Sequence, residues 1–278
     1  MILPTPGRAF AWRETPAGPA LVCEPLLEFA AHLFTTRAWA LGSQPPDTDL
    51  DAAWAGVAAA MDVAPSHLAR MNQVHGREIV TASPESSTVQ ADIIVSDDPT
   101  LALAVRAADC VPLLFVDPVS HAVAAVHAGW RGMAARVPET AVEAMTARFG
   151  SRREDLMVAA GPSIGACCYE VGADVRRAFD QAGFPAADVD RWFLAEPAPT
   201  LRNPSMPQLS AARKGGHWFF DGWASVRDQL TMAGVSADRI FSTDWCTASH
   251  EALFCSYRRD GSGAGRLAGA IRPLRRRP

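Results

Sequence analysis

The chain has 278 residues, of which 49% are hydrophobic and 20% are charged, and its formal net charge is −4. This balance is typical of a globular protein and excludes a disordered chain, which would have fewer apolar residues and more net charge. It also argues against a nucleic-acid partner bound by bulk electrostatics, because there is no excess positive charge to neutralise phosphates. The apolar runs are too short to cross a membrane, and the N-terminus lacks the pattern of a secretory signal. We therefore expect a soluble, cytoplasmic protein with no membrane or nucleic-acid partner.

The first thirty residues include Pro4, Pro6 and Pro16 and predict irregular structure at an edge of the fold. After them, the pattern of apolar and turn-forming residues predicts a strand over 33–37, a helix over 49–61 and a strand over 78–81. Four short apolar runs separated by Asp- and Pro-containing turns then predict strands over 92–95, 101–107, 111–116 and 121–127.

Helices alternate with strands in the second half of the chain. A helix starts near Pro138, a residue suited to a first helical turn. The elements expected after it are a strand over 156–160, a helix over 172–181, a Pro-rich segment over 195–208, a helix over 221–232, and strands over 239–245 and 266–272. This order predicts an α/β fold with a mixed sheet covered by helices. Without a repeat or a convincing linker, we expect one domain over 1–278 that ends in a basic tail, Arg275-Arg276-Arg277.

Six cysteines occur, at positions 23, 110, 167, 168, 246 and 255, and none are spaced as Cys-x-x-Cys. Their wide spacing is unlike that of a disulfide scaffold and agrees with a reducing compartment. The adjacent pair Cys167 and Cys168 cannot act as a local metal knuckle. Any chemistry of these thiols therefore requires residues that folding brings together.

His75, Cys110 and His127 each lie where a strand-like run meets a turn. Imidazole and thiolate are ligands that zinc favours, and three protein ligands leave a fourth position open, as in catalytic sites. No local motif connects the three residues, since 35 and 17 positions separate them. Spacing alone leaves open that Cys110 is a buried thiol and that the histidines are ordinary polar residues at strand ends.

Two further segments are candidates for binding an anion. Arg131 lies in His-Ala-Gly-Trp-Arg-Gly (127–132), before an expected helix, where a guanidinium and backbone N–H groups can bind phosphate. The alternative is a turn with a buried Trp130 and a salt-bridged Arg131. The small residues of 161–166 form either an anion-binding loop or a structural turn, and they match neither nucleotide-binding glycine motif.

Five motifs in series resemble the laccase-domain family, also called the multicopper polyphenol oxidase or purine nucleoside phosphorylase family, which includes the peptidoglycan editing factor. They are Asn72-Gln73-Val74-His75-Gly76, Ala108-Asp109-Cys110-Val111-Pro112, His127-Ala128-Gly129-Trp130-Arg131-Gly132, Gly161-Pro162-Ser163-Ile164-Gly165 and Ser256-Tyr257-Arg258-Arg259. The resemblance covers about residues 33–270. It implies α/β/β/α layers and a metal site at His75, Cys110 and His127, usually zinc, with copper as the alternative. The chain departs from the family at Ala38-Trp39-Ala40, where a Gly-Gly pair is usual, and in the position of Pro138.

The resemblance implies a metal-dependent purine nucleoside phosphorylase that acts on adenosine, inosine or methylthioadenosine with phosphate, with adenosine deaminase side activity. In this interpretation Arg37 and Arg131 bind phosphate, and Asn72, Gln73 and Tyr257 contact the base or sugar. Asp109 or Glu78 would transfer protons beside the three metal ligands. The protein would be a monomer or a homodimer.

Three alternatives use the same ligands. The first is a zinc amidase that removes L-serine from a nucleotide-linked peptidoglycan precursor, and the second is a non-catalytic metal-binding module. The third, a copper-dependent polyphenol oxidase, is disfavoured because a four-copper cluster needs His-x-His pairs, and none occurs among the seven histidines.

Overall fold

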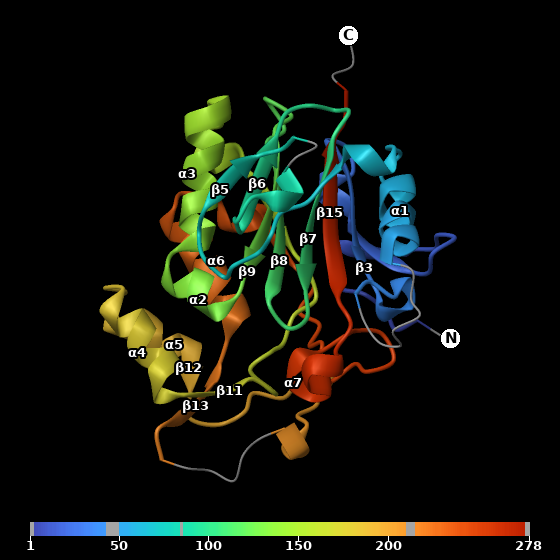
Figure 1. The fold of residues 1–278 in the computed structure, drawn as a ribbon. Coiled ribbons are helices and arrows are strands. Elements are labelled where there is room, and N and C mark those ends of the chain that lie inside the picture. The colour runs from blue at the N-terminus through green and yellow to red at the C-terminus, as the bar shows by residue number, and fades with distance from the viewer. Residues whose placement is uncertain (1–2, 43–49, 84–85, 210–214, 276–278) are drawn as a thin grey trace.

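Two six-stranded sheets lie face to face in the computed structural model, which describes residues 3–42, 50–83, 86–209 and 215–275 (Figure 1). The first sheet consists, in spatial order, of β1 (Phe10–Arg13), β2 (Ala20–Cys23), β3 (Ala30–Thr35), β15 (Leu267–Pro273), β7 (Ala102–Ala107) and β4 (Leu68–Ala69). The second consists of β14 (Ile240–Ser242), β10 (Met157–Ala160), β8 (Val111–Val116), β9 (Val123–Ala128), β6 (Ile93–Ser96) and β5 (Ile79–Thr81). Both sheets contain parallel and antiparallel pairs.

The strand β8 shows how the layers pack. Successive side chains of a strand point to opposite faces, so a strand covered on both faces is apolar throughout. Leu114 and Val116 pack between the two sheets, whereas Leu113 and Phe115 pack toward helices on the other face. All six residues of β8 are buried as a result.

Helices cover the outer face of each sheet. The first sheet is covered by α1 (Leu50–Ala60), through Trp54 and Val57. The second is covered by α2 (Trp130–Ala134), α3 (Val137–Phe149) and α6 (Gly222–Met232), as Figure 1 shows. The predicted α/β/β/α layering is confirmed, and α3 begins one residue before Pro138. No helix in the described ranges is both long and apolar enough to cross a membrane.

The prediction of irregular structure over the first thirty residues is wrong. β1 and β2 pair antiparallel, from Phe10 opposite Cys23 to Arg13 opposite Ala20, and they extend the first sheet beyond β3. The prolines Pro4, Pro6 and Pro16 lie outside both strands, so they interrupt no ladder. In the basic tail, Arg275 is exposed, and Arg276 and Arg277 lie outside the described residues.

A third, three-stranded sheet was not predicted from the sequence. It contains β11 (Glu170–Gly172), β13 (His217–Phe220) and β12 (Phe193–Leu194), and it lies beside α4 (Ala173–Gln181) and α5 (Ala186–Trp192). Phe179, Trp192 and Phe220 are fully buried here, with Phe179 in ring contact with both of the others. Its strands are too short to show the two-residue alternation of apolar and polar side chains that predicts a strand. The packing of these aromatic rings holds the strands in place.

The register of the second sheet brings distant residues to one edge. Pro112 lies opposite His127 in the β8–β9 pair, so Cys110, two residues earlier, lies at the same end. Ile93 lies opposite Val126 in the β6–β9 pair, which places Asp92 directly opposite His127. The N–H of His127 accordingly donates to the carbonyl of Asp92 at 2.9 Å.

Gly161, which follows β10, provides a test of the contact between the sheets. A Cβ at this position would lie 2.3 Å from Cδ1 of Phe34, which is buried, and 2.9 Å from Cγ of Pro112. We expect Gly161→Ala to lower the free energy of unfolding by about 3 kcal/mol, measured by urea denaturation, because the side chain of Phe34 cannot move away. Gly263→Ala is the control, since no atom lies within 4 Å of its added Cβ. An equal effect of the two substitutions would contradict this packing.

Candidate metal centre

The buried carboxylate of Asp92 organises the loop that contains His75. It accepts hydrogen bonds from the backbone N–H groups of Val74, His75 and Gly76, at 3.2, 3.1 and 2.7 Å. His75 adopts a φ of 62° in this loop, a left-handed conformation that is uncommon for histidine. These hydrogen bonds turn the backbone so that the imidazole of His75 points toward the end of β9.

The same carboxylate also orients His127. Nδ1 of His127 donates to Oδ1 of Asp92 at 2.7 Å, because a carboxylate can only accept. Nε2 of His127 is therefore the ring nitrogen that can bind a cation. Burial alone would raise the pKa of Asp92, but the hydrogen bonds from His127 and the loop N–H groups hold it below its ordinary value.

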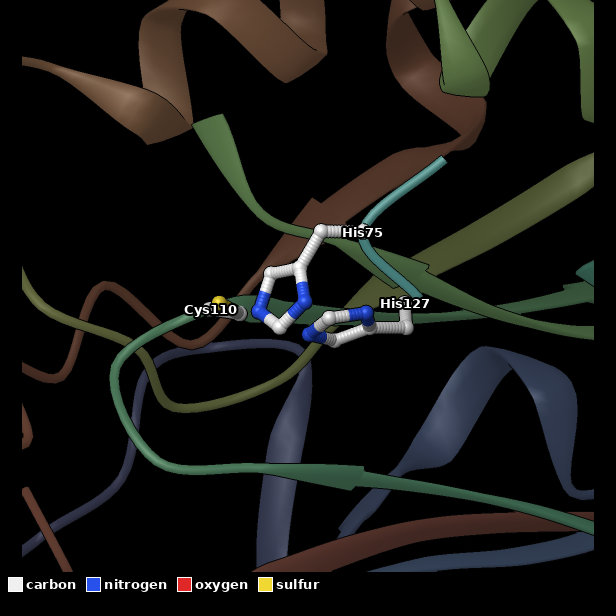
Figure 2. Close-up of side chains that lie close together, drawn as sticks. All are labelled: His75, Cys110 and His127. Carbon is white, nitrogen blue, oxygen red and sulfur yellow. The ribbon is translucent and has the colours of Figure 1, made fainter. Parts of the chain in front are cut away.

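His75, Cys110 and His127 point toward one another from three segments (Figure 2). One ligand atom from each lies within 4.8 Å of the other two, and the imidazole rings are 4.7 Å apart at 81°. Gly129 makes this approach feasible, since a Cβ there would lie 3.0 Å from Sγ of Cys110 and 3.1 Å from Cδ2 of His75. Two imidazoles and one thiol of this geometry fit a single cation with an open coordination position.

The charges of Cys110 and His127 stabilise each other. Burial alone would raise the pKa of Cys110, but the positive charge of His127 and hydrogen bonds from both histidines lower it to about 6. Burial lowers the pKa of His127, but Cys110 and Asp92 together raise it to about 9. Without a metal the two groups therefore form a thiolate–imidazolium pair at neutral pH.

A cavity of about 560 Å³ opens beside the cluster. Its lining combines the three ligands with arginines and aromatic rings: Gln73, His75, Arg106, Ala107, Ala108, Asp109, Cys110, His127, Trp130, Arg131, Tyr169, Tyr257, Arg258 and Arg266. None of its four arginines forms an ion pair with an acidic residue in the described ranges. The cavity therefore favours an anionic ligand.

The structure places Arg131, Gln73 and Tyr257 at this cavity. Arg131 stacks on the ring of Trp130 at 4.2 Å, and Tyr257 is 55% exposed. The amide of Gln73 bonds twice to the backbone of Arg106, at 2.8 Å each, and so ties the His75 loop to β7. Gln73 is thus fixed by the protein and is a weaker candidate for a base contact than the sequence suggested.

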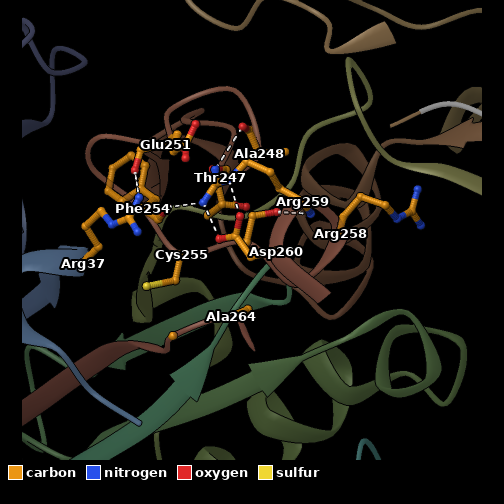
Figure 3. A network of polar contacts seen from close by, with 12 residues as sticks. Arg37, Thr247, Ala248, Glu251, Phe254, Cys255, Arg258, Arg259, Asp260 and Ala264 are labelled. Carbon is orange, nitrogen blue, oxygen red and sulfur yellow. Dashed lines mark hydrogen bonds and ion pairs between the residues drawn. The ribbon is translucent and has the colours of Figure 1, made fainter. Parts of the chain in front are cut away.

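Arg37, Asn72 and Glu78 do not line the cavity. Arg37 lines a separate hollow with residues 249–253 and donates to the carbonyl of Glu251 (Figure 3). Asn72 forms backbone bonds with Val89 and Ala91. The structure therefore places neither residue at the cavity, and Arg37 as a phosphate ligand and Asn72 as a base contact stay predictions from the sequence.

Asp109 lies at the cavity, but its carboxylate already has partners. Thr247 donates its hydroxyl to Oδ1, and the N–H of Arg258 donates to Oδ2, both at 2.6 Å. Burial nevertheless raises the pKa of Asp109 above its ordinary value. A carboxyl group with a raised pKa beside a cation site can exchange protons with a ligand. Arg259, two residues from Tyr257, instead binds the carbonyls of Thr247, Ala248 and Phe254 (Figure 3).

Asp92 and Arg106 are the site residues that the sequence analysis missed. Asp92 directly precedes an apolar strand, and a carboxylate at a fully buried position needs several donors. The sequence shows this acidic residue at the start of an apolar run, but not the backbone donors that give it its role. Arg106 breaks an otherwise buried strand with an exposed side chain, which is a second signal of this kind.

The fold and this Cys/His cluster define an α/β/β/α protein with a candidate metal centre, and comparison with known proteins gives its family. A family model described as multi-copper polyphenol oxidoreductase laccase matches residues 34–273, so the chain belongs to this laccase-like family. The chain is 34% identical to a purine nucleoside phosphorylase of Deinococcus radiodurans over 86% of this chain and 88% of the relative.

Two more similarities concern activity and fold. An adenosine deaminase, RL5, from an unknown prokaryotic organism is 34% identical over 66% of this chain and 62% of its own length. The crystal structure of the Bacillus licheniformis hypothetical protein YfiH superposes with a TM-score of 0.78 at 26% identity, covering 94% of this chain and 98% of that one.

In the described part of the chain, no histidine besides 75 and 127 belongs to a group of three candidate ligands.

Replacing Asp92 tests its positioning role. We expect Asp92→Asn to lower zinc affinity by about 10- to 100-fold, because the orientation of both imidazoles depends on its carboxylate. The measurement is competition with a chromophoric zinc chelator. Asp117→Asn is the matched control, since Asp117 is equally buried and caps the turn at the far end of β8 and β9. Equal affinities in the two variants would contradict the role of Asp92.

The thiolate–imidazolium pair gives a pH prediction for metal-free protein. We expect the alkylation rate of Cys110 to rise through a midpoint at about pH 6, the value to which its neighbours lower its pKa. His127→Asn removes the positive partner and should move the midpoint upward, toward about 8.5. Alkylation is followed by mass spectrometry of the peptide with Cys110. His121→Asn, at the other end of β9, should leave the midpoint unchanged, and a shift equal to that of His127→Asn would refute the pairing.

Proposed function

We propose that this chain is a metal-dependent purine nucleoside phosphorylase that cleaves adenosine, inosine or methylthioadenosine with phosphate. The observation that carries the proposal is the position of the cation site in the same cavity as four arginines and three aromatic rings. The names of its relatives, purine nucleoside phosphorylase and adenosine deaminase, support the same substrate class.

Zinc is the cation that we propose for His75, Cys110 and His127, with copper as the alternative. The mixed imidazole and thiolate donors suit both metals, and three ligands with an adjoining cavity are typical of catalytic zinc. When bound, the metal supplies positive charge and Lewis acidity at the wall of the cavity. Asp92 keeps His127 in the tautomer that leaves Nε2 available for it.

Arg106 and Arg131 are the best placed to bind the phosphate. Their guanidinium groups donate no hydrogen bond within the described ranges, whereas those of Arg258 and Arg266 are bound to backbone carbonyls. Burial and repulsion from the positive charges of Arg266 and Arg70 lower the pKa of Arg106. A bound anion would offset this repulsion between the guanidinium groups. A planar guanidinium also binds two phosphate oxygens at once, which fixes the anion for attack on the ribose.

The aromatic rings and Asp109 suit the purine. The exposed ring of Tyr257 offers a stacking surface for a base. Asp109, with its raised pKa, is our candidate for the group that gives a proton to the departing purine. Proton transfer by the same residue would also serve the deamination of adenosine as a side activity.

The proposed activity is tested with purified, zinc-loaded protein, adenosine and phosphate. We expect adenine and ribose 1-phosphate as products, together with some inosine. Cys110→Ala should lower kcat/KM by at least about 100-fold, since it removes a metal ligand. Arg131→Ala should raise the KM for phosphate by about 10-fold, because a charge-assisted hydrogen bond is lost.

Arg152→Ala is the control, since Arg152 is exposed and lies outside the cavity. The proposal fails if the loaded protein releases neither free base nor inosine. Release of L-serine from the serine-linked peptidoglycan precursor, with no turnover of nucleosides, would assign the cavity to the amidase reaction.

A further inference from the structure

A second cluster of candidate ligands consists of Cys167, Cys168 and Cys246, which we call the trithiol cluster. The three Sγ atoms lie within 4.8 Å of one another, although 78 positions separate Cys168 from Cys246 in the chain. The three residues are 3%, 1% and 0% exposed. None of them lines the 560 Å³ cavity, so this cluster is separate from the His75 site.

Backbone contacts hold the trithiol cluster together. Ser163 and Cys246 form an isolated parallel bridge, and the N–H of Thr247 donates to the carbonyl of Ser163 at 3.0 Å. The N–H of Cys246 donates to Oδ1 of Asn203 at 2.9 Å. The N–H of Cys168 donates to the carbonyl of Gly165 at 2.9 Å. Convergence of the sulfurs is therefore built into the loops after β10 and β14, without any disulfide.

Apolar side chains surround the cluster, and its polar neighbours include the Ser249 hydroxyl and the carbonyl of Pro204, to which the thiol of Cys168 donates at 3.7 Å. Ile164 and Ala248 are buried with the thiols, and Met206, Leu209 and Trp223 pack against them. Oγ of Ser249 lies 3.6 Å from Sγ of Cys167 and 3.4 Å from Sγ of Cys168. Because Ser249 donates its proton to the carbonyl of Pro204 at 2.7 Å, its lone pairs are free to face the sulfurs.

We propose that the trithiol cluster binds one thiophilic cation, copper(I) or zinc(II). Metal–sulfur bonds of about 2.3 Å place the sulfurs of one ion roughly 4 Å apart, which the observed spacing accommodates. Thiolates select these two ions over harder cations. On binding, the thiols that coordinate release their protons to solvent, and the ion is bound through the sulfurs left behind.

The two ions would use the donors differently. Copper(I) is satisfied by three sulfurs alone, whereas zinc prefers four ligands and would add Oγ of Ser249. The three cysteines line neither the 560 Å³ cavity nor the hollow at Arg37 and Ser249, so we assign the ion a structural role. Thr247, next to Cys246, donates to Asp109, so an ion here would stiffen the loop that holds Asp109 beside Cys110. The proposal does not depend on the proposed phosphorylase activity.

The test isolates this cluster by removing the first site. The full chain with His75→Ala and Cys110→Ala is stripped of metal under a non-thiol reductant and without oxygen. It is then titrated with copper(I) in one arm and zinc(II) in the other, each against a chromophoric chelator. We expect one equivalent to bind in at least one arm, and that arm identifies the ion.

Adding Cys246→Ala to this background should abolish the bound equivalent. Cys23→Ala is the matched control, because Cys23 is fully buried but lies outside the cluster, and it should retain the equivalent. The proposal is overturned if neither ion binds to the background protein, or if Cys246→Ala leaves the binding intact.

A second measurement uses the wild-type chain and needs no variant to fold. X-ray absorption of protein loaded with two equivalents should show about two sulfur neighbours per ion at about 2.3 Å, because the His75 site offers one thiolate and the trithiol cluster three. An average of one sulfur neighbour or fewer per ion would overturn the proposal.

Discussion

The interaction on which the site depends is the set of hydrogen bonds to the Asp92 carboxylate. A buried carboxylate needs several donors, since an unpaired buried charge is strongly destabilising. Here three backbone N–H groups and Nδ1 of His127 supply them. One buried charge thereby fixes both the loop conformation that presents His75 and the ring orientation of His127. The position of these two candidate ligands is thus determined by the same carboxylate.

Sheet geometry brings Cys110 to this pair. The β8–β9 register places Cys110 at the same end as His127, and Gly129 leaves the space that the thiol and the His75 ring occupy. The layers on either side keep that register, because a slip of one residue would exchange the side chains that β8 packs into the two cores. The arginine-lined cavity then lies beside the cluster, so the candidate cation ligands and the four arginines share one space.

Much of this could be predicted from the sequence, for physical reasons. Apart from Arg106, β7 and β8 are buried on both faces, so the sequence shows 102–107 and 111–116 as nearly continuous apolar runs. The motifs indicated His75, Cys110 and His127, which the structure brings together. The role of Asp92 could not be predicted, because three of its four donors are backbone groups, which leave no side-chain signature. Arg37 was assigned to the phosphate only from the family resemblance, whereas in the structure its guanidinium contacts Glu251, more than two hundred positions away.

Anomalous diffraction from crystals of the zinc-loaded, wild-type chain tests the central claim most directly. The arrangement around Asp92 predicts a zinc peak bonded to Cys110, His75 and Nε2 of His127, with the remaining coordination position facing the cavity. A peak that leaves His75 or His127 unbound, or a fourth protein ligand that closes the position, would contradict it.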